Sequence, residues 1–221
     1  VVFPNKRAAF YLRNEFKKTS QETLWLPRMV SIEEAVTQWS GIELADDIEI
    51  LFELIDIDAQ LHVEQNSDLS VFGSQAAQMA KDFDEIDQYG IDAQHVFNYV
   101  IENKRLEFWN FDEERAKEKE LKYLRFFNSL YQYYLRLHEV LSAKGKGYYG
   151  MITRHLANLP EEDLLNRLGE TKVIFAGFNA MTKTEEQIVS TLIKNGRAEI
   201  LFDYDLYYLD NPTNEAGFFA R

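Results

Sequence analysis

The 221-residue sequence contains no cysteine, which excludes a disulfide framework and a thiolate metal site. It has only four prolines and ten glycines, as is typical of a helix-rich protein with few tight turns. No apolar run reaches the roughly 18–20 residues that a membrane-spanning helix needs. The first residues also lack the pattern of a signal peptide. We therefore expect a cytoplasmic protein that makes no contact with a membrane.

Basic residues are in the minority. The sequence has 24 lysines and arginines against 37 aspartates and glutamates, so its formal net charge is −13. A surface of this sign repels nucleic acid unless cations are concentrated locally. DNA binding would therefore require a small basic patch. Apolar residues make up 46% of the chain, which is enough to bury a core and argues against a disordered protein.

Short strand-like runs followed by helices occur near both ends of the sequence. Val1–Phe3 precedes helix-forming residues 7–18, and Val173–Ala176 precedes a helix that ends near Lys194, before the strand-like run Ile200–Phe202. This spacing predicts a parallel sheet with right-handed crossovers. Two capping boxes, in which a Ser or Thr and a Glu three residues later cap a helix, mark helix starts here: Ser31 with Glu34, and Thr182 with Glu185.

The middle of the sequence has helical periodicity almost throughout. The longest predicted helix follows Asp112 and ends before Gly145, a glycine placed as helix ends favour. The pattern predicts an α/β core from residues 1–40 and 171–221, with an all-helical insertion over residues 41–170. We also expect the chain to be part of a longer protein. The clearest helical stripe comprises Leu69, Phe72, Ala76, Met79, Phe83 and Ile86.

Several motifs that could carry chemistry have simpler interpretations. The acidic run 81–87 lies on a predicted helix and matches no calcium loop, so we assign its carboxylates mostly to solvent. Residues 203–205, Asp-Tyr-Asp, follow a predicted strand but lack the downstream pattern of a nuclease. The Gly145-Lys146-Gly147 run lacks the Ser or Thr of a phosphate loop. The four histidines have no ligand spacing, and we predict no metal site.

Pro4, Asn5, Lys6 and Arg7 form the most informative local motif. They lie between a predicted strand and a predicted helix start, where free backbone N–H groups and the helix dipole favour an anion. Lys6 and Arg7 add two cations, and Asn5 adds a polar side chain. Asn5, Lys6 and Arg7 are therefore predicted to contact a phosphate backbone, although the same residues also suit a solvated turn.

Two segments carry a resemblance to a known family. The run from Val2 to Ala8, Val-Phe-Pro-Asn-Lys-Arg-Ala, is similar to the Thr-x-Asn-Lys-x-Ala segment that lies against single-stranded DNA in UvrD-like helicases, although Pro4 departs from that pattern. The segment Phe175, Ala176, Gly177 and Phe178 resembles the Walker B strand of AddB-type subunits. Together they resemble the helicase-like half of these subunits, which belong to bacterial helicase–nucleases that process DNA double-strand ends for recombination.

This resemblance implies a P-loop-NTPase-like core with the helical insertion. It also implies an AddA-type helicase–nuclease subunit as partner. In full-length relatives a PD-(D/E)XK nuclease domain would lie beyond residue 221, so the parent protein would be an exonuclease and helicase-related hydrolase. The Walker A loop would lie before Val1, and the sequence contains no Walker A pattern. Ala176 stands where a Walker B carboxylate would hold Mg²⁺, which alanine cannot do.

These features imply no catalytic residue, no cofactor and no small-molecule substrate in this chain. Three functions remain open. The first is a non-hydrolysing scaffold that holds single-stranded DNA beside an active motor or nuclease. The second is an active ATP-dependent helicase domain that has been truncated. The third is a protein–protein interaction module without DNA contact, which the negative charge favours.

We predict that the chain does not bind ATP with useful affinity, because it has no Gly-Lys-Ser/Thr loop and has alanine at position 176. Isothermal titration with Mg·ATP should show no binding tighter than a Kd of about 100 μM, equivalent to about 5.5 kcal/mol. A tighter constant would favour the truncated helicase domain.

Overall fold

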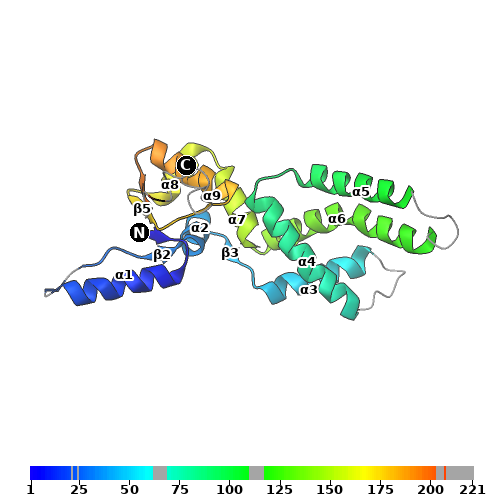
Figure 1. Ribbon diagram of the computed structural model, residues 1–221, viewed down its shortest axis with the longest axis horizontal. Helices are drawn as coiled ribbons and strands as arrows, with labels where there is room; N and C mark the ends of the chain where they lie inside the picture. Colours follow the sequence, from blue (N-terminus) through cyan, green and yellow to red (C-terminus); the bar gives the residue numbers. More distant parts are fainter. Residues whose placement is uncertain (21, 24, 62–68, 110–116, 203–206, 208–221) are drawn as a thin grey trace. The chain divides into compact units, whose positions relative to one another are not determined.

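The computed structural model describes residues 1–20, 22–23, 25–61, 69–109, 117–202 and 207 (Figure 1). Internal contacts divide the chain into two compact units. The sheet unit consists of Val1–Gly41 and His155–Arg221, and the helical unit consists of Ile42–Arg154. Across the described ranges, no helix has both the length and the apolar character that crossing a membrane requires.

The described part of the sheet unit contains four parallel strands in the order β2-β1-β5-β6. Val2 lies opposite Val30 on one side and Phe175 on the other, so the strands end level at one edge of the sheet. The parallel α/β sheet predicted from the spacing is therefore confirmed. The strands are β1 (Val2–Phe3), β2 (Val30–Ser31), β5 (Val173–Ala176) and β6 (Ala198–Leu201).

Helices cover both faces of this sheet. On one face, α1 packs its apolar side, including Ala9 and Phe16, against Phe3. On the other face, the ring of Trp39 in α2 meets the ring of Phe175 edge-on, with 6.4 Å between centroids. Val2 lies opposite Phe175, so the two side chains point to the same face of the sheet, and Phe3, the next residue after Val2, points to the other face. Helices α1 and α2 therefore lie on opposite sides of the sheet. The described part of this unit includes the helices α1 (Lys6–Thr19), α2 (Ile32–Ser40), α8 (Glu161–Leu168) and α9 (Lys183–Lys194).

Both predicted capping boxes are confirmed. In each, the N-cap hydroxyl accepts a hydrogen bond from the backbone N–H of the glutamate, and the glutamate carboxylate accepts one from the N-cap backbone N–H. They open α2 at Ser31 and α9 at Thr182. Gly41 ends α2 in the left-handed conformation, with φ of 69°, which favours glycine over other residues. The local sequence thus fixes where these helices begin and where α2 ends.

The boundary between the two units differs from the predicted one. We expected the helical insertion to reach residue 170, but residues from His155 onward belong to the sheet unit. The reason is that α8 packs on α2, and Arg167 donates hydrogen bonds to the backbone carbonyls of Trp39 and Ser40. Gln187 of α9 also bonds the carbonyl of Ala157. Helical periodicity alone does not distinguish a helix on a sheet from a helix in a bundle.

The helical unit is built around a single apolar core. Its largest fully buried side chains include Leu54, Phe83, Tyr133, Leu137 and Leu141. The rings of Phe83 and Tyr134 meet edge-on at 5.5 Å, a favourable aromatic geometry. The elements of this unit are β3 (Glu43–Leu44), α3 (Asp47–Leu61), α4 (Leu69–Gln88), α5 (Ala93–Trp109), α6 (Lys117–Ala143), β4 (Lys146–Gly147) and the first part of α7 (Tyr149–Ala157).

Helix α3 corrects one expectation about burial. Its sequence has two apolar faces, which predicts a helix that is buried on both sides. One face, with Ile50, Leu54 and Ile57, is buried as expected. On the other face, Leu51 and Ile55 are partly buried against the core, but Ile48 and Phe52 are 63% and 61% exposed. The helix is therefore fully buried only on the side that contacts α4 and α6.

We predict that Gly150→Ala destabilises the helical unit. A Cβ at Gly150, in α7, would overlap the backbone carbonyl oxygen of Asp84 in α4. Forcing an extra carbon into a packed contact of this kind costs about 1–3 kcal/mol. Gly73→Ala is the matched control, because a Cβ there meets open space within α4 and should stabilise the helix by about 0.5–1 kcal/mol. Urea unfolding followed by circular dichroism measures the free energy of unfolding of both variants. Equal changes in the two variants would contradict the close contact between Gly150 and Asp84.

Candidate functional site

The edge at which the strands of the sheet unit end is the candidate functional site. The chain passes from β1 to β2 on one side and reaches β5 on the other, so the strand order reverses between β1 and β5. In open α/β sheets, ligands bind at the carboxyl ends of the strands at such a reversal. Two loops lie there, one after Phe3 and one after Ala176.

Asn5 caps α1 at this edge. Its Oδ1 atom accepts hydrogen bonds from the backbone N–H groups of Arg7 and Ala8, at 3.0 and 3.2 Å. We expected the backbone donors here to be free for an anion. Because the Asn5 side chain already satisfies two of them, an anion at this edge would depend more on side-chain cations.

Lys6 connects the starts of α1 and α2. Its Nζ lies 3.2 Å from Oε1 of Glu34, the glutamate of the α2 capping box. The backbone N–H of Ser31 and the Lys6 ammonium together lower the pKa of Glu34, so this carboxylate stays charged at neutral pH. The side chains of Lys6 and Glu34 are 69% and 41% exposed, and ion pairs that solvent reaches contribute little to stability. Lys6 can therefore exchange Glu34 for another anion at low cost.

Arg7 is the third residue of the predicted contact, and its side chain is exposed. No ion pair involves it within the residues that the structure describes. Asn5, Lys6 and Arg7 thus lie between the end of β1 and the first turn of α1, as predicted, but they have different roles. Asn5 is a helix cap, Lys6 bridges two helices, and Arg7 presents a cation to solvent.

The Walker-B-like segment is packed rather than open. Phe175 and Phe178 are buried and meet edge-on, with 5.9 Å between ring centroids. Ala176 packs against the apolar cluster beneath α1. Gly177 has φ of 73°, and its N–H donates to the carbonyl of Leu201 in β6. No group of acidic or histidine side chains suited to a metal occurs in the described residues, and the Asp-Tyr-Asp run at 203–205 lies outside them.

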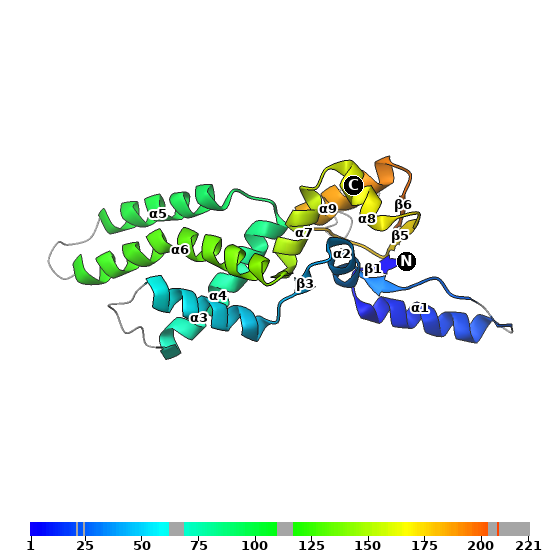
Figure 2. The same ribbon diagram turned by 180° about the vertical axis from the view of Figure 1, so that it is seen from behind.

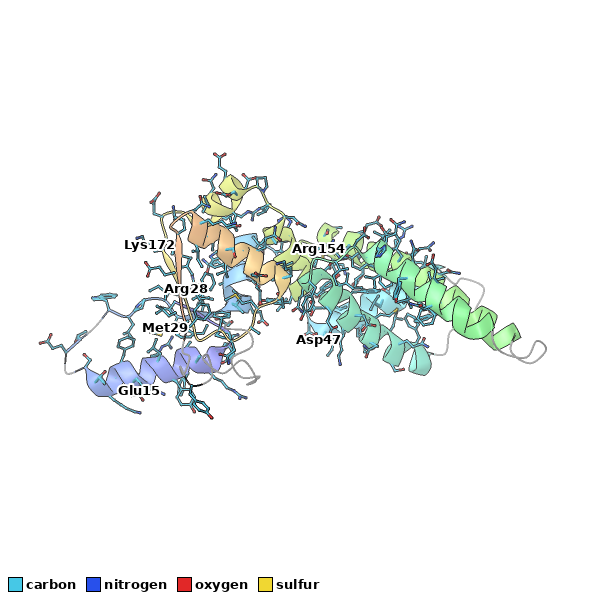
Figure 3. All side chains as sticks on the ribbon, turned by 45° about the horizontal axis from the view of Figure 1, so that its top comes forward. Glu15, Arg28, Met29, Asp47, Arg154 and Lys172 are labelled. Atoms are coloured by element: carbon cyan, nitrogen blue, oxygen red, sulfur yellow. The ribbon has the colours of Figure 1, made fainter. Side chains whose placement is uncertain are left out.

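A second polar cluster lies inside the helical unit, and it is centred on Asp87 of α4. The Asp87 side chain is fully buried, and both of its oxygens are occupied. Oδ1 accepts from the Tyr134 hydroxyl at 2.6 Å and from Arg154 Nη1 at 2.9 Å. Oδ2 accepts from the Tyr148 hydroxyl at 2.5 Å and lies 2.9 Å from His138 Nε2. Arg154 is labelled in Figure 3.

This Asp87 cluster corrects part of our assignment of the 81–87 run to solvent: Asp82 and Glu85 are exposed as expected, whereas Asp84 is half-buried and Asp87 is buried. Asp84, one turn earlier in α4, accepts from the backbone N–H of Gly150 and from the Gln88 side chain. The sequence did contain a signal for Asp87, which lies four residues after Phe83 and next to Ile86 in the apolar stripe. A carboxylate at such a position faces the core and needs buried donors.

The charges of the two aspartates respond differently to burial. Burial raises the pKa of Asp84 above its usual value, although the Gly150 N–H opposes this. Burial also acts on Asp87, but the hydrogen bonds from His138, Tyr134 and Tyr148 outweigh it, so the pKa of Asp87 is lowered. The pKa values of Tyr134 and Tyr148 are raised by burial, which keeps both hydroxyls protonated as donors. Asp87 thus connects α4 with α6 and α7. Because four partners already occupy its two oxygens, it has no acceptor site left for a metal or a substrate.

The Gly145-Lys146-Gly147 run forms a structural contact, in keeping with the absence of a phosphate-loop pattern. Lys146 lies in β4, which pairs with β3, and its Nζ lies 2.8 Å from Oε2 of Glu49. That hydrogen bond raises the pKa of Lys146. A second carboxylate, that of Glu43, lies 3.6 Å away. Two neighbouring carboxylates make this lysine a poor ligand for phosphate.

Comparison with protein-family models gave no match, and neither did a search of curated proteins. The resemblance to AddB-type subunits therefore stays a prediction that rests on the two segments quoted above.

We predict that Asp87→Asn destabilises the helical unit by roughly 3 kcal/mol, because it leaves Arg154 and the other donors without a buried carboxylate. The lowered pKa of Asp87 means that its contribution is present above the unfolded pKa of about 3.9 and is lost as the pH falls through the folded value. The difference from wild type should be constant from about pH 5 to 7 and shrink below about pH 4.

Urea unfolding across this pH range measures the effect. Glu85→Gln is the control, because Glu85 is an exposed carboxylate on the same helix. A difference that does not change with pH, or one that Glu85→Gln reproduces, would show that the Asp87 charge does not hold the cluster together.

Proposed function

We propose that this chain is a non-hydrolysing, helicase-like scaffold that holds single-stranded DNA by its backbone within a complex that repairs DNA double-strand breaks. The fold would be the P-loop-NTPase-like core of an AddB-type subunit. The chain would act in the cytoplasm beside an AddA-type helicase–nuclease subunit.

One observation carries this proposal. The two segments that carry the family resemblance are far apart in sequence, yet they form β1 and β5, which are adjacent and parallel. Their following loops lie at the same edge, where the strand order reverses. This adjacency supports our proposal that the predicted DNA contact and the Walker-B-like segment belong to one site.

The packing of Ala176 supports a scaffold over a truncated helicase domain. Ala176 is part of the apolar contact between β5 and α1, together with Phe3 and Met29. A carboxylate at this position would need room and polar partners that this cluster does not supply. The chain is therefore suited to holding DNA without an ATP-driven step.

A protein-interaction module without DNA contact is the second candidate. The formal net charge of −13 favours it, because a negative field opposes DNA at long range. The DNA-holding scaffold requires that basic residues concentrated in one place outweigh the negative field of the rest of the chain.

The test is binding of the full chain to a fluorescently labelled 20-residue oligothymidylate, measured by anisotropy at several salt concentrations. We expect sequence-tolerant binding whose salt slope falls by about 1–1.5 when Lys6 and Arg7 are both replaced by alanine. The matched control replaces Lys172 and Lys194, two exposed lysines elsewhere in the sheet unit, by alanine.

An unchanged affinity and slope in the Lys6→Ala, Arg7→Ala double variant would remove the DNA contact from this edge. A wild-type chain that binds no oligonucleotide would leave the protein-interaction module as the leading function.

A further inference from the structure

Helix α1 differs in charge from the chain that contains it. Its 14 residues include five basic side chains and one acidic one, whereas the chain as a whole has a formal net charge of −13. All five basic side chains are exposed: Lys6, Arg7, Arg13, Lys17 and Lys18. The basic residues at the start of α1 are therefore the first of a series that continues along the whole helix.

Two aromatic rings lie among these cations. Phe10 is 62% exposed and Tyr11 is 70% exposed. Neither is part of the apolar cluster that α1 forms with β1 and Met29. Exposed apolar side chains that are adjacent, as these two are, mark an interaction surface more often than ones scattered singly.

Helical spacing arranges these side chains in two rows. Residues three or four positions apart are neighbours on a helix surface. The first row comprises Lys6, Phe10, Arg13 and Lys17, and the second comprises Arg7, Tyr11, Asn14 and Lys18. Each row has one aromatic ring with cations before and after it. We call the two rows the outer face of α1.

Packing of the opposite side of α1 keeps the outer face directed toward solvent. Ala8, Ala9, Leu12 and Phe16 pack toward Phe3 and Met29, which are in or next to the sheet. Both ribbon views show the segment that returns from α1 toward β2 running alongside the helix (Figures 1 and 2), and Figure 3 labels Glu15 on α1 and Met29 on that segment. The outer face is therefore held by packing on one side and presented to solvent on the other.

Local ion pairs do not neutralise the outer face. Lys18 pairs with Glu15 at 2.6 Å, and Lys6 pairs with Glu34 at 3.2 Å. These pairs are exposed, so exchanging a carboxylate for another anion costs little. Arg7, Arg13 and Lys17 have no ion pair within the described part of the chain.

We infer that the outer face of α1 binds single-stranded nucleic acid, with phosphates on its cations and bases stacked on Phe10 and Tyr11. This inference rests on the proposed function and extends it from the start of α1 along the whole helix. Cations interleaved with exposed aromatic rings are the surface on which single strands bind, because every base has a face that can stack. The face is also positive where the rest of the chain is negative, so its occupant must be an anion.

An acidic protein surface fits this face less well. Lysines are depleted from the cores of protein interfaces, whereas three of the five cations here are lysines that flank the rings. Burying them against a protein would require a carboxylate for each. A single strand supplies phosphates at regular intervals and leaves the cations partly hydrated.

The experiment compares three double variants of the full chain, each checked for folding by circular dichroism. One replaces Arg13 and Lys17 by alanine, one replaces Phe10 and Tyr11 by alanine, and the control replaces Lys172 and Lys194 by alanine. Lys172, labelled in Figure 3, lies just before β5 and away from α1 in the sequence. Binding is measured to oligothymidylate of 20 residues and to a 20-base-pair duplex.

We expect loss of Arg13 and Lys17 to weaken oligothymidylate binding about 10- to 30-fold at 0.1 M salt, since each phosphate contact contributes a slope of about 0.7. Loss of Phe10 and Tyr11 should weaken it at least about fivefold but leave duplex binding unchanged, because the bases of a duplex are already stacked. The control should bind like wild type.

Two outcomes would overturn the inference, and they differ in what else they overturn. If wild type binds the oligonucleotide and both outer-face variants bind equally well, the outer face is not the contact, while the proposed DNA-holding function stands. If wild type binds neither oligonucleotide nor duplex, both proposals fall, and the outer face is left to an acidic protein.

Discussion

Two parallel strands that follow each other in the chain must be joined by a connection that runs from one end of the sheet back to the other. In this chain the connection from β2 to β5 contains the whole helical unit. The pairing of β1 with β5 is therefore the contact on which the sheet unit depends. It places the starts of α1, α2 and α9 after strands that end level, and it creates the reversal of strand order where the candidate site lies. The entropy lost in closing such a connection grows only slowly with its length, so the helical unit can be large without preventing the pairing.

Much of this fold could be predicted from the sequence because its signals are local. Capping boxes fix the starts of α2 and α9, and the 3.6-residue stripe from Leu69 to Ile86 identifies α4, since each depends on residues only a few positions apart. The prediction of an all-helical insertion was wrong at β3 and β4, which pair there but have two residues each and leave no periodic pattern. The assignment of α8 to the sheet unit also needed contacts between distant residues, such as that of Arg167 with Ser40.

The polar residues were harder to predict than the apolar ones. At Asn5 the sequence identified the helix start correctly, but the same side chain that marks the start also occupies its backbone donors. At Asp87 the surrounding acidic residues suggested solvent, whereas the donors that make burial possible come from α6 and α7, far along the chain. In both places the residue type was informative. The role of each residue, however, depends on its hydrogen-bond partners, and these cannot be predicted from the residue type alone.

The pairing of β3 with β4 has a consequence for how this protein can evolve. Glu43 lies opposite Lys146 and Leu44 opposite Gly147, so the start and the end of the helices α3 to α6 are held side by side. A segment whose two ends are adjacent can be lengthened, shortened or replaced as one cassette without altering the strand order beside it. The sheet unit and the helical unit are therefore free to diverge at different rates.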